Sequence, residues 1–260
     1  MSDFTGPDQY QKFFDPKAYL ERYFSLAGDT VDEYVHFVLK HLSQVFNSGK
    51  VKGETLIDIG TGPSIYQLLS ACEAFNEIIA TDFTERNREE FKAWLTNQPG
   101  AFDWSPVVKY ACQLEGDRIP WNEKEDCLRK AIKQVLQCDI LKDNPTDPVV
   151  VPPADCVLSC LCLESACKDQ ESYITGLNNI STLLKPGGYL VLVGVLGNVY
   201  YMVGERKFSA LFLTESFIRE SLCNAGYVVE EFVSSEKPDE SWEGTAQFSS
   251  IYVFVAKKMA

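Results

Sequence analysis

Basic side chains are scarce in this sequence. Its 260 residues include 24 Lys and Arg against 37 Asp and Glu, which gives a formal net charge of −13. A surface that binds phosphate backbones needs clustered cations, and the chain contains no run of Lys and Arg. The composition therefore disfavours a nucleic-acid-binding protein, and we expect no nucleic-acid partner.

The sequence also lacks a long apolar run. Its most apolar segment, residues 189–203, is interrupted by glycines and Asn198 and is shorter than the roughly 20 residues of a membrane-spanning helix. Residues 1–14 are polar and lack the apolar stretch of a signal peptide. We therefore expect a cytoplasmic protein without a membrane partner.

Metal-ligating patterns are scarce as well. Only two histidines occur, and the nine cysteines form no C-x-x-C pair. Four cysteines are close in sequence: Cys156, Cys160, Cys162 and Cys167. Zinc sites usually show tighter ligand spacing, and an odd number of cysteines without a signal peptide favours free thiols. We expect no metal, and small buried thiols on a strand and the loop after it.

From residue 55 onward, predicted strands alternate with predicted helices. The strands are 55–59, 77–83, 137–140, 154–159, 189–196, 227–234 and 250–256, and the helices are 64–75, 84–97, 123–135, 171–184 and 214–225. This order predicts an α/β fold with a mostly parallel seven-stranded sheet, covered on both faces. The last two strands have no helix between them, so the sheet should end with an antiparallel strand.

Two helices are predicted before residue 50. Asp15 can cap the first, because Pro16 follows it at the first helical position. Thr30-Val31-Asp32-Glu33 has the pattern of a capping box that opens the second helix, and Asn47-Ser48-Gly49 ends that helix. A further stop is predicted at Leu-Lys-Pro-Gly-Gly, residues 184–188.

A glycine turn follows the first predicted strand, in the stretch ETLIDIGTGPSIYQLL at residues 54–69. Ligands of open α/β sheets bind at the carboxyl ends of the strands, and glycine lets the backbone approach them closely. Asp82 ends the next strand, where a carboxylate can accept both hydroxyl groups of a ribose. Gly60, Gly62 and Asp82 together predict a nucleoside site.

The turn argues against a nucleotide with phosphates. A dinucleotide site usually has a third glycine, and Ile65 occupies that position here. No G-K-[ST] triplet follows the turn, so a phosphate-binding loop is excluded too. A nucleoside without phosphates fits better, and we predict S-adenosylmethionine as cofactor with S-adenosylhomocysteine as product.

Several blocks of the chain resemble the small-molecule amine N-methyltransferases, the family of the nicotinamide, phenylethanolamine and indolethylamine N-methyltransferases. The blocks are TLIDIGTGPSIYQLLSAC (55–72), TDFTERNREE (81–90), FDWSPVVKY (102–110), ADCVLSCLCLESAC (154–167), LKPGG (184–188) and YYMVGERKFS (200–209). The similarity extends from Phe4 nearly to the C-terminus. It implies a Rossmann-like class I methyltransferase domain at residues 51–260, and a helical lid at residues 1–50 that belongs to the same domain.

The resemblance also implies a donor site. Its residues are Tyr19, Tyr23, Gly60, Thr61, Gly62, Ser64, Tyr66, Asp82, Asn87, Asp139, Ile140 and Cys160. In this assignment the turn lies beside the methionine part, Asp82 holds the ribose, and Asp139 with Ile140 reads the adenine. Without the resemblance, Asp139 would equally fit a turn residue and Asn87 a residue at a helix start.

For the acceptor, the resemblance implies Glu164 and Tyr19 as catalytic residues, and Glu164, Asn198, Tyr201 and Ala210 as substrate-binding residues. A primary amine is largely protonated at neutral pH, since such groups have a pKa of about 10. A carboxylate can hold the ammonium group and remove its proton before methyl transfer. By itself, Glu164 would equally fit a solvated carboxylate on a loop.

Two positions depart from the family pattern. Gly194 stands where the nicotinamide and phenylethanolamine enzymes carry an acid, and Ala210 replaces a serine of the nicotinamide enzyme. Both departures favour an N-methyltransferase of indolethylamine-like amines, with thioethers as further acceptors. Separately, we expect a monomer. The alternatives are a nicotinamide N-methyltransferase and a non-catalytic nucleoside-binding module.

Overall fold

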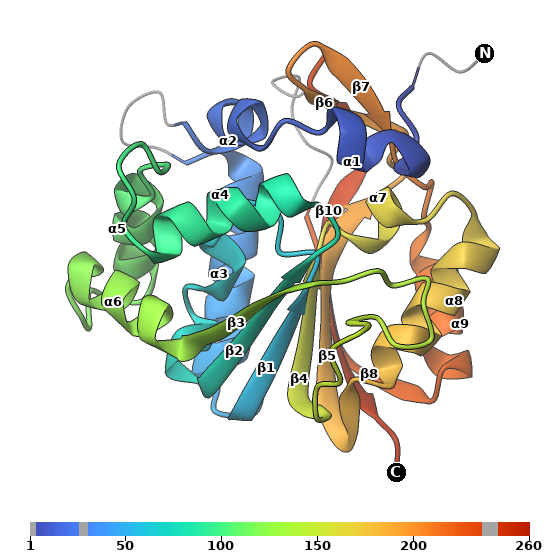
Figure 1. Ribbon diagram of the computed structural model, residues 1–260. Helices are drawn as coiled ribbons and strands as arrows, with labels where there is room; N and C mark the ends of the chain where they lie inside the picture. Colours follow the sequence, from blue (N-terminus) through green and yellow to red (C-terminus); the bar gives the residue numbers. More distant parts are fainter. Residues whose placement is uncertain (1–3, 26–30, 236–243) are drawn as a thin grey trace.

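The computed structural model describes residues 4–25, 31–235 and 244–260, and a seven-stranded sheet forms its centre (Figure 1). The strand order is β3-β2-β1-β4-β5-β10-β8. The strands are β1 (Gly53–Ile59), β2 (Phe75–Asp82), β3 (Ile132–Gln137), β4 (Ala154–Cys160), β5 (Leu184–Leu196), β8 (Tyr227–Ser234) and β10 (Ser250–Lys258). Only β10 is antiparallel to its neighbours β5 and β8 in this sheet, so the predicted fold with an antiparallel strand near its end is confirmed.

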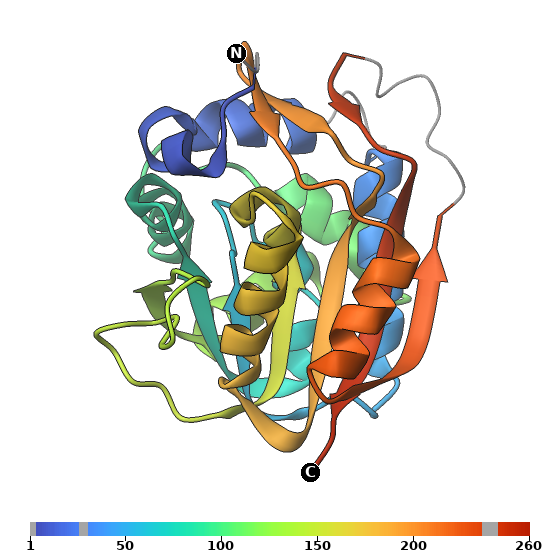
Figure 2. The same ribbon diagram turned by 90° about the vertical axis from the view of Figure 1, so that its right-hand side faces the viewer.

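Helices cover both faces of the sheet (Figures 1 and 2). One face packs against α3 (Glu33–Asn47), α4 (Glu85–Leu95), α5 (Ser105–Leu114) and α6 (Trp121–Ala131), and the other against α8 (Gln170–Ser181) and α9 (Glu215–Asn224). Successive side chains of a strand point to opposite faces. Accordingly Leu158 belongs to the first core and its neighbour Val157 to the second, which explains why the central strands are apolar throughout.

A second layer lies across the carboxyl ends of the parallel strands (Figure 1). It contains η1 (Pro7–Gln9), α1 (Tyr10–Phe13), α2 (Pro16–Phe24) and a small sheet of β6 (Tyr200–Val203), β7 (Arg206–Ser209) and β9 (Ala246–Gln247). Thr5 bridges to Phe208 on β7, so the N-terminal segment and the segment after β5 are joined. The sequence did not predict this small sheet.

Local capping explains where the N-terminal helices begin. The Asp15 carboxylate accepts hydrogen bonds from the backbone N–H groups of Lys17 and Ala18, at 3.0 and 3.1 Å, which confirms the predicted cap of α2. The cap of α3 is Asp32, whose carboxylate accepts from the Tyr34 N–H at 2.8 Å. Thr30, the predicted cap of this helix, lies outside the described residues.

Four predictions were wrong in extent or type. Residues 64–75 form two short 3₁₀ segments, η2 (Tyr66–Leu68) and η3 (Ala71–Glu73), instead of one helix. The helix predicted to reach residue 135 ends at Ala131, and the strand predicted at 137–140 occupies residues 132–137. The predicted stop at residues 184–188 opens β5, since α8 already ends at Ser181. Helix α5 was not predicted.

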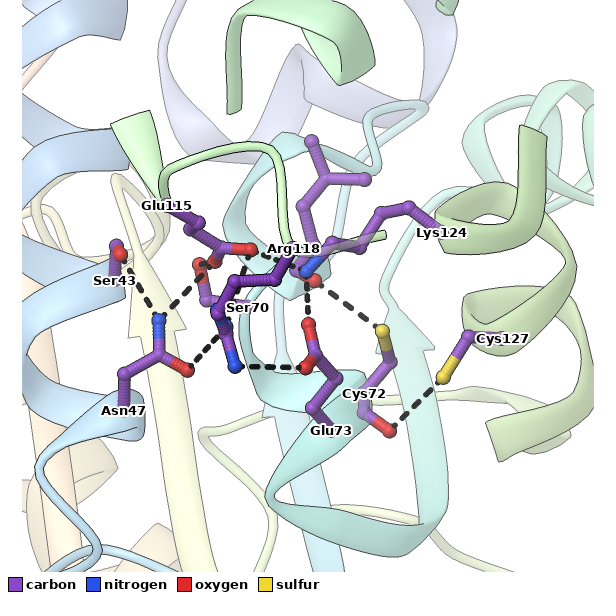
Figure 3. A network of polar contacts seen from close by, with 10 residues as sticks. Ser43, Asn47, Ser70, Cys72, Glu73, Glu115, Arg118, Lys124 and Cys127 are labelled. Carbon is purple, nitrogen blue, oxygen red and sulfur yellow. Dashed lines mark hydrogen bonds and ion pairs between the residues drawn. The ribbon is translucent and has the colours of Figure 1, made fainter. Parts of the chain in front are cut away.

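A buried lysine fixes α6 against the loop after β1 (Figure 3). The Lys124 ammonium is fully buried and contacts the carboxylates of Glu73 and Glu115. Arg118 lies 3.4 Å from Glu73 at the exposed side of the group. Because charged groups are rarely buried unless they are paired, this network specifies how α6 docks.

Candidate active site

A cavity of about 370 Å³ lies at the carboxyl ends of the parallel strands, beneath the second layer. The predicted site residues that line it are Tyr19, Tyr23, Gly60, Thr61, Gly62, Ser64, Tyr66, Asp82, Asp139, Ile140, Cys160, Glu164, Asn198 and Tyr201. The structure therefore brings together residues from both ends and the middle of the chain. Asn87 and Ala210 are outside this lining.

The glycine turn after β1 lies directly against the loop after β4. Gly60 has a φ of +71°, a left-handed conformation that side-chain-bearing residues rarely adopt. A Cβ atom at this position would lie 2.3 Å from the Cys162 Sγ. Glycine is therefore required here both by the backbone conformation and by the close approach of the two loops.

The Asp82 carboxylate holds the turn from the neighbouring strand. It accepts hydrogen bonds from the backbone N–H groups of Gly62 and Thr84, both at 2.8 Å, and from the Asn87 Nδ2 at 3.0 Å. Burial raises the pKa of this carboxyl, and the hydrogen bonds oppose that rise. Asn87 thus contacts Asp82 and does not face the cavity.

Sequence reasoning missed a second support of the turn. Gln67 donates hydrogen bonds to the Asp58 carboxylate at 3.0 Å and to the Thr61 carbonyl at 3.1 Å, from inside the fold. Burial raises the pKa of Asp58 to about 7. The only signal for these residues was that both lie within the LIDIGTGPSIYQLL stretch.

Tyr34, on α3, is another lining residue that sequence reasoning missed. Its hydroxyl lies 3.1 Å from the Tyr66 hydroxyl and 3.6 Å from the Cys160 Sγ. Tyr66 is itself 3.1 Å from the same sulfur. These three groups form a polar wall at the α3 side of the cavity.

Glu164 lies at the opposite side of the cavity, on α7 (Leu163–Ala166). Only 2 % of its surface is exposed, and its Oε1 lies 3.3 Å from the backbone nitrogen of Val195, which donates to it. The Leu211 N–H donates to the Glu164 carbonyl at 2.7 Å and fixes α7 in place. Burial raises the pKa of the Glu164 carboxyl to about 7, so both of its protonation states are populated at neutral pH.

Two further predicted residues differ in their position. Asn198 is buried and lines the cavity, and its Oδ1 has no hydrogen-bond partner within the described residues. Ala210 contributes its backbone instead, because its N–H donates to the Val199 carbonyl at 3.1 Å. It supports the wall of the cavity without lining it.

Tyr19 and Tyr23 come from one face of α2. The Tyr23 hydroxyl donates to the Met202 carbonyl on β6 at 2.8 Å, and its ring lies 5.0 Å from the Tyr19 ring. Arg22 donates to the Gly204 carbonyl at 3.0 Å. Helix α2 is therefore fastened to the small sheet above the cavity, and Tyr19 closes the space below it.

Comparison with known proteins decides the family. The model described as the NNMT/PNMT/TEMT family matches residues 2–259. The chain belongs to this family. Nicotinamide N-methyltransferase of Sus scrofa is 47 % identical over all of this chain and 98 % of that protein. Indolethylamine N-methyltransferase of Oryctolagus cuniculus is 46 % identical over 98 % of this chain and 97 % of that protein.

Solved structures of methyltransferases share this fold. Magnesium protoporphyrin IX methyltransferase of Synechocystis with bound S-adenosylmethionine aligns with a TM-score of 0.57 at 12 % identity, covering 97 % of this chain and 94 % of that one. The chain is an S-adenosylmethionine-dependent amine N-methyltransferase. No helix within the described ranges has the length and apolarity of a membrane span.

Proposed function

We propose that this enzyme methylates small aromatic amines of the indolethylamine type, with tryptamine-like molecules as acceptors. The observation that carries the proposal is the buried carboxylate of Glu164 beside Gly194. Glycine at position 194 leaves Glu164 without a second acid on β5, which suits an acceptor with one amine and an apolar ring.

We further propose how the cavity is divided. The turn at Gly60, Thr61 and Gly62 holds the methionine part of the donor with Ser64 and Tyr66, Asp82 accepts from its ribose, and Asp139 with Ile140 binds its adenine. In this assignment Asn87 acts through Asp82, and Ala210 acts through the backbone of the acceptor wall. Residues 1–50 form a lid within the same domain as residues 51–260.

S-adenosylmethionine supplies an electrophilic methyl group on a sulfonium when it is bound. The residues of the chain prepare the acceptor for it. Glu164 binds the ammonium group and accepts its proton, which leaves the amine nitrogen with a lone pair. Tyr19 and Tyr201 orient the acceptor from above, and the layer over the cavity excludes water.

Thioethers are proposed as additional acceptors. Their sulfur carries a lone pair at every pH and needs no base, so the cavity would have only to orient them.

A nicotinamide N-methyltransferase remains the second candidate, because the Sus scrofa enzyme of that name has the same degree of identity as the indolethylamine enzyme. Nicotinamide, like a thioether, has no ammonium proton to lose before methyl transfer.

The test is methyl transfer from labelled S-adenosylmethionine to tryptamine, serotonin, phenylethanolamine, nicotinamide and a dialkyl sulfide. The proposal expects the highest kcat/KM with the two indolethylamines. Turnover led by nicotinamide would support the second candidate instead. Donor binding without turnover on any acceptor would favour a nucleoside-binding module and would contradict the proposal.

A further inference from the structure

Position 194 has no room for a side chain. In the antiparallel register of β5 and β10, Gly194 is paired with Tyr252. A Cβ atom on Gly194 would lie 2.6 Å from the Tyr252 hydroxyl oxygen and 2.7 Å from the Glu164 Oε1. Real Cβ atoms do not approach other atoms this closely, so the hydroxyl and the carboxylate already fill the space beside the strand.

The same measurement places the two oxygens on one side of β5. Both lie within 2.7 Å of a single point, so the phenol oxygen of Tyr252 and the carboxylate of Glu164 are neighbours beside the empty position, without a hydrogen bond between them in this structure. The Tyr252 ring is 1 % exposed and packs edge-on against the Phe254 ring, with 5.4 Å between centroids. This packing fixes its hydroxyl on the Glu164 side of β5.

The surroundings of Glu164 determine how far a hydrogen-bond donor would stabilise its charged form. The titratable groups that face its carboxylate are hydroxyls and thiols from the lid, the sheet and α8: Tyr19, Cys160, Cys162, Cys167, Tyr173, Tyr201 and Tyr252. None of these is a cation. A buried carboxylate without a cationic partner depends on hydrogen-bond donors for its charged form.

We propose that Tyr252 is a positioning residue of the reaction: its hydroxyl occupies the space that a second acid at position 194 would need, and it turns to donate a hydrogen bond to the neighbouring Glu164 carboxylate once that group is ionised. Tyr252 thereby favours acceptors with one amine and an apolar ring, because its neutral hydroxyl lies where a second carboxylate would otherwise stand. This inference rests on the proposed function for its kinetic consequence only. The pKa of the Tyr252 hydroxyl is raised well above its usual value, by burial first and by Glu164 among nearby charges, so the hydroxyl keeps its proton.

The first test needs no acceptor. The pKa of the Glu164 carboxyl is higher in the folded state than in the unfolded state. The free energy of unfolding of wild type, compared with that of Glu164→Gln, therefore decreases as pH rises from 4.5. The decrease levels off near pH 7, where the folded-state carboxyl loses its proton. The melting temperatures of both proteins are measured from pH 5 to pH 9, with and without Tyr252→Phe. We expect the levelling-off point to move upward by about one pH unit when the hydroxyl is absent.

The second test is kinetic. Tyr252→Phe should move the acidic limb of kcat/KM for tryptamine to higher pH by the same amount, and leave a dialkyl sulfide within twofold. Tyr227→Phe, a buried tyrosine on β8 paired with the opposite end of β10, is the matched control and should change neither. An unchanged levelling-off point would overturn the inference, even if tryptamine is a good acceptor. A shifted point with no tryptamine turnover would support Tyr252 and reject the proposed acceptor.

Discussion

Glu164 is the residue on which the acceptor chemistry depends. The free energy of burying its charge is large enough to bring its pKa to about 7, so small changes of pH alter the fraction that can accept a proton. The carboxylate form increases as pH rises through 7. An acceptor that must lose a proton should respond to this change, and an acceptor without one should not.

We therefore expect Glu164→Gln to lower kcat/KM for tryptamine about 100-fold, within the usual range for loss of a general base. Turnover of a dialkyl sulfide should stay within twofold. In wild type, kcat/KM for tryptamine should rise through pH 7 while the sulfide rate stays flat. Steady-state assays with both acceptors from pH 6 to pH 9 measure this, with Glu171→Gln on the exposed surface of α8 as control. Equal slowing of both acceptors would contradict the role of Glu164 as a base.

The glycine turn offers a second prediction at this scale. Gly49 and Gly60 both have positive φ, at +75° and +71°, but a Cβ at Gly49 would meet nothing within 4 Å. Gly49→Ala should therefore lower the free energy of unfolding by about 1 kcal/mol, from the backbone conformation alone. Gly60→Ala should cost at least about 2 kcal/mol more, because its methyl group would collide with Cys162.

Urea unfolding of the two alanine variants measures this difference, and calorimetry measures donor affinity. Gly60→Ala should also weaken S-adenosylmethionine binding at least tenfold, whereas Gly49→Ala should leave it unchanged. If both variants lost the same stability, the contact between the two loops would have no energetic role.

Sequence reasoning was strong at individual residues where chemistry and position coincide. The glycine turn after β1 and the carboxylates at the ends of β2, β3 and β4 were predicted, since parallel strands bring their carboxyl ends to one edge. Tyr252 was missed because β10 inserts between β5 and β8, and only that pairing places it opposite Gly194. The departure at Gly194 was visible in the sequence, but what fills the space was not.

At the scale of elements, burial explains why some strands were predicted. The core strands β1, β4 and β10 are mostly buried and were found as apolar runs. Edge strand β3 is largely exposed, so its residues continued the polar pattern of α6 and were predicted as helix. The strands of the small sheet are two to four residues long and pair with distant segments, which leaves no local signal.

The docking of α6 gives a prediction at this scale. Lys124→Met would leave the carboxylates of Glu73 and Glu115 together without their cation, so we expect a loss of about 3 to 5 kcal/mol in the free energy of unfolding at pH 7.

The matched control is Lys50→Met. Lys50 also contacts two carboxylates, Glu230 and Glu231, but its side chain is 39 % exposed. Its loss should cost less than about 1 kcal/mol. Urea unfolding at pH 7 compares the variants. A similar cost for both lysines would mean that burial does not amplify the α6 pairing.

For the whole molecule, the second layer makes the cavity depend on the N-terminal helices. The hydrogen bond from Tyr23 to Met202 joins α2 to the small sheet. Tyr23→Phe removes it, and we expect the KM for S-adenosylmethionine to rise about fivefold, as expected for about 1 kcal/mol from one hydrogen bond. Thermal stability of the main sheet should change little.

Limited trypsin digestion tests the same link. Cleavage after Lys12, Lys17 or Arg22 should slow when S-adenosylhomocysteine is bound, and the protection should be weaker in Tyr23→Phe. Tyr189→Phe, at the far end of β5 from the cavity, serves as control. Equal protection in all three proteins would show that this hydrogen bond does not hold the layer closed.

The order of strands has a consequence for synthesis on the ribosome. Strand β10 is translated after both of its neighbours and then enters between β5 and β8. Until it emerges, β5 carries an unpaired edge along residues 189–196, which is open to association with other nascent chains. Because β10 also carries Tyr252, a chain halted before this strand would lack both the closed sheet and the neutral partner of Glu164. The addition of β10 therefore completes the sheet and supplies the neighbour of Glu164 in the same step.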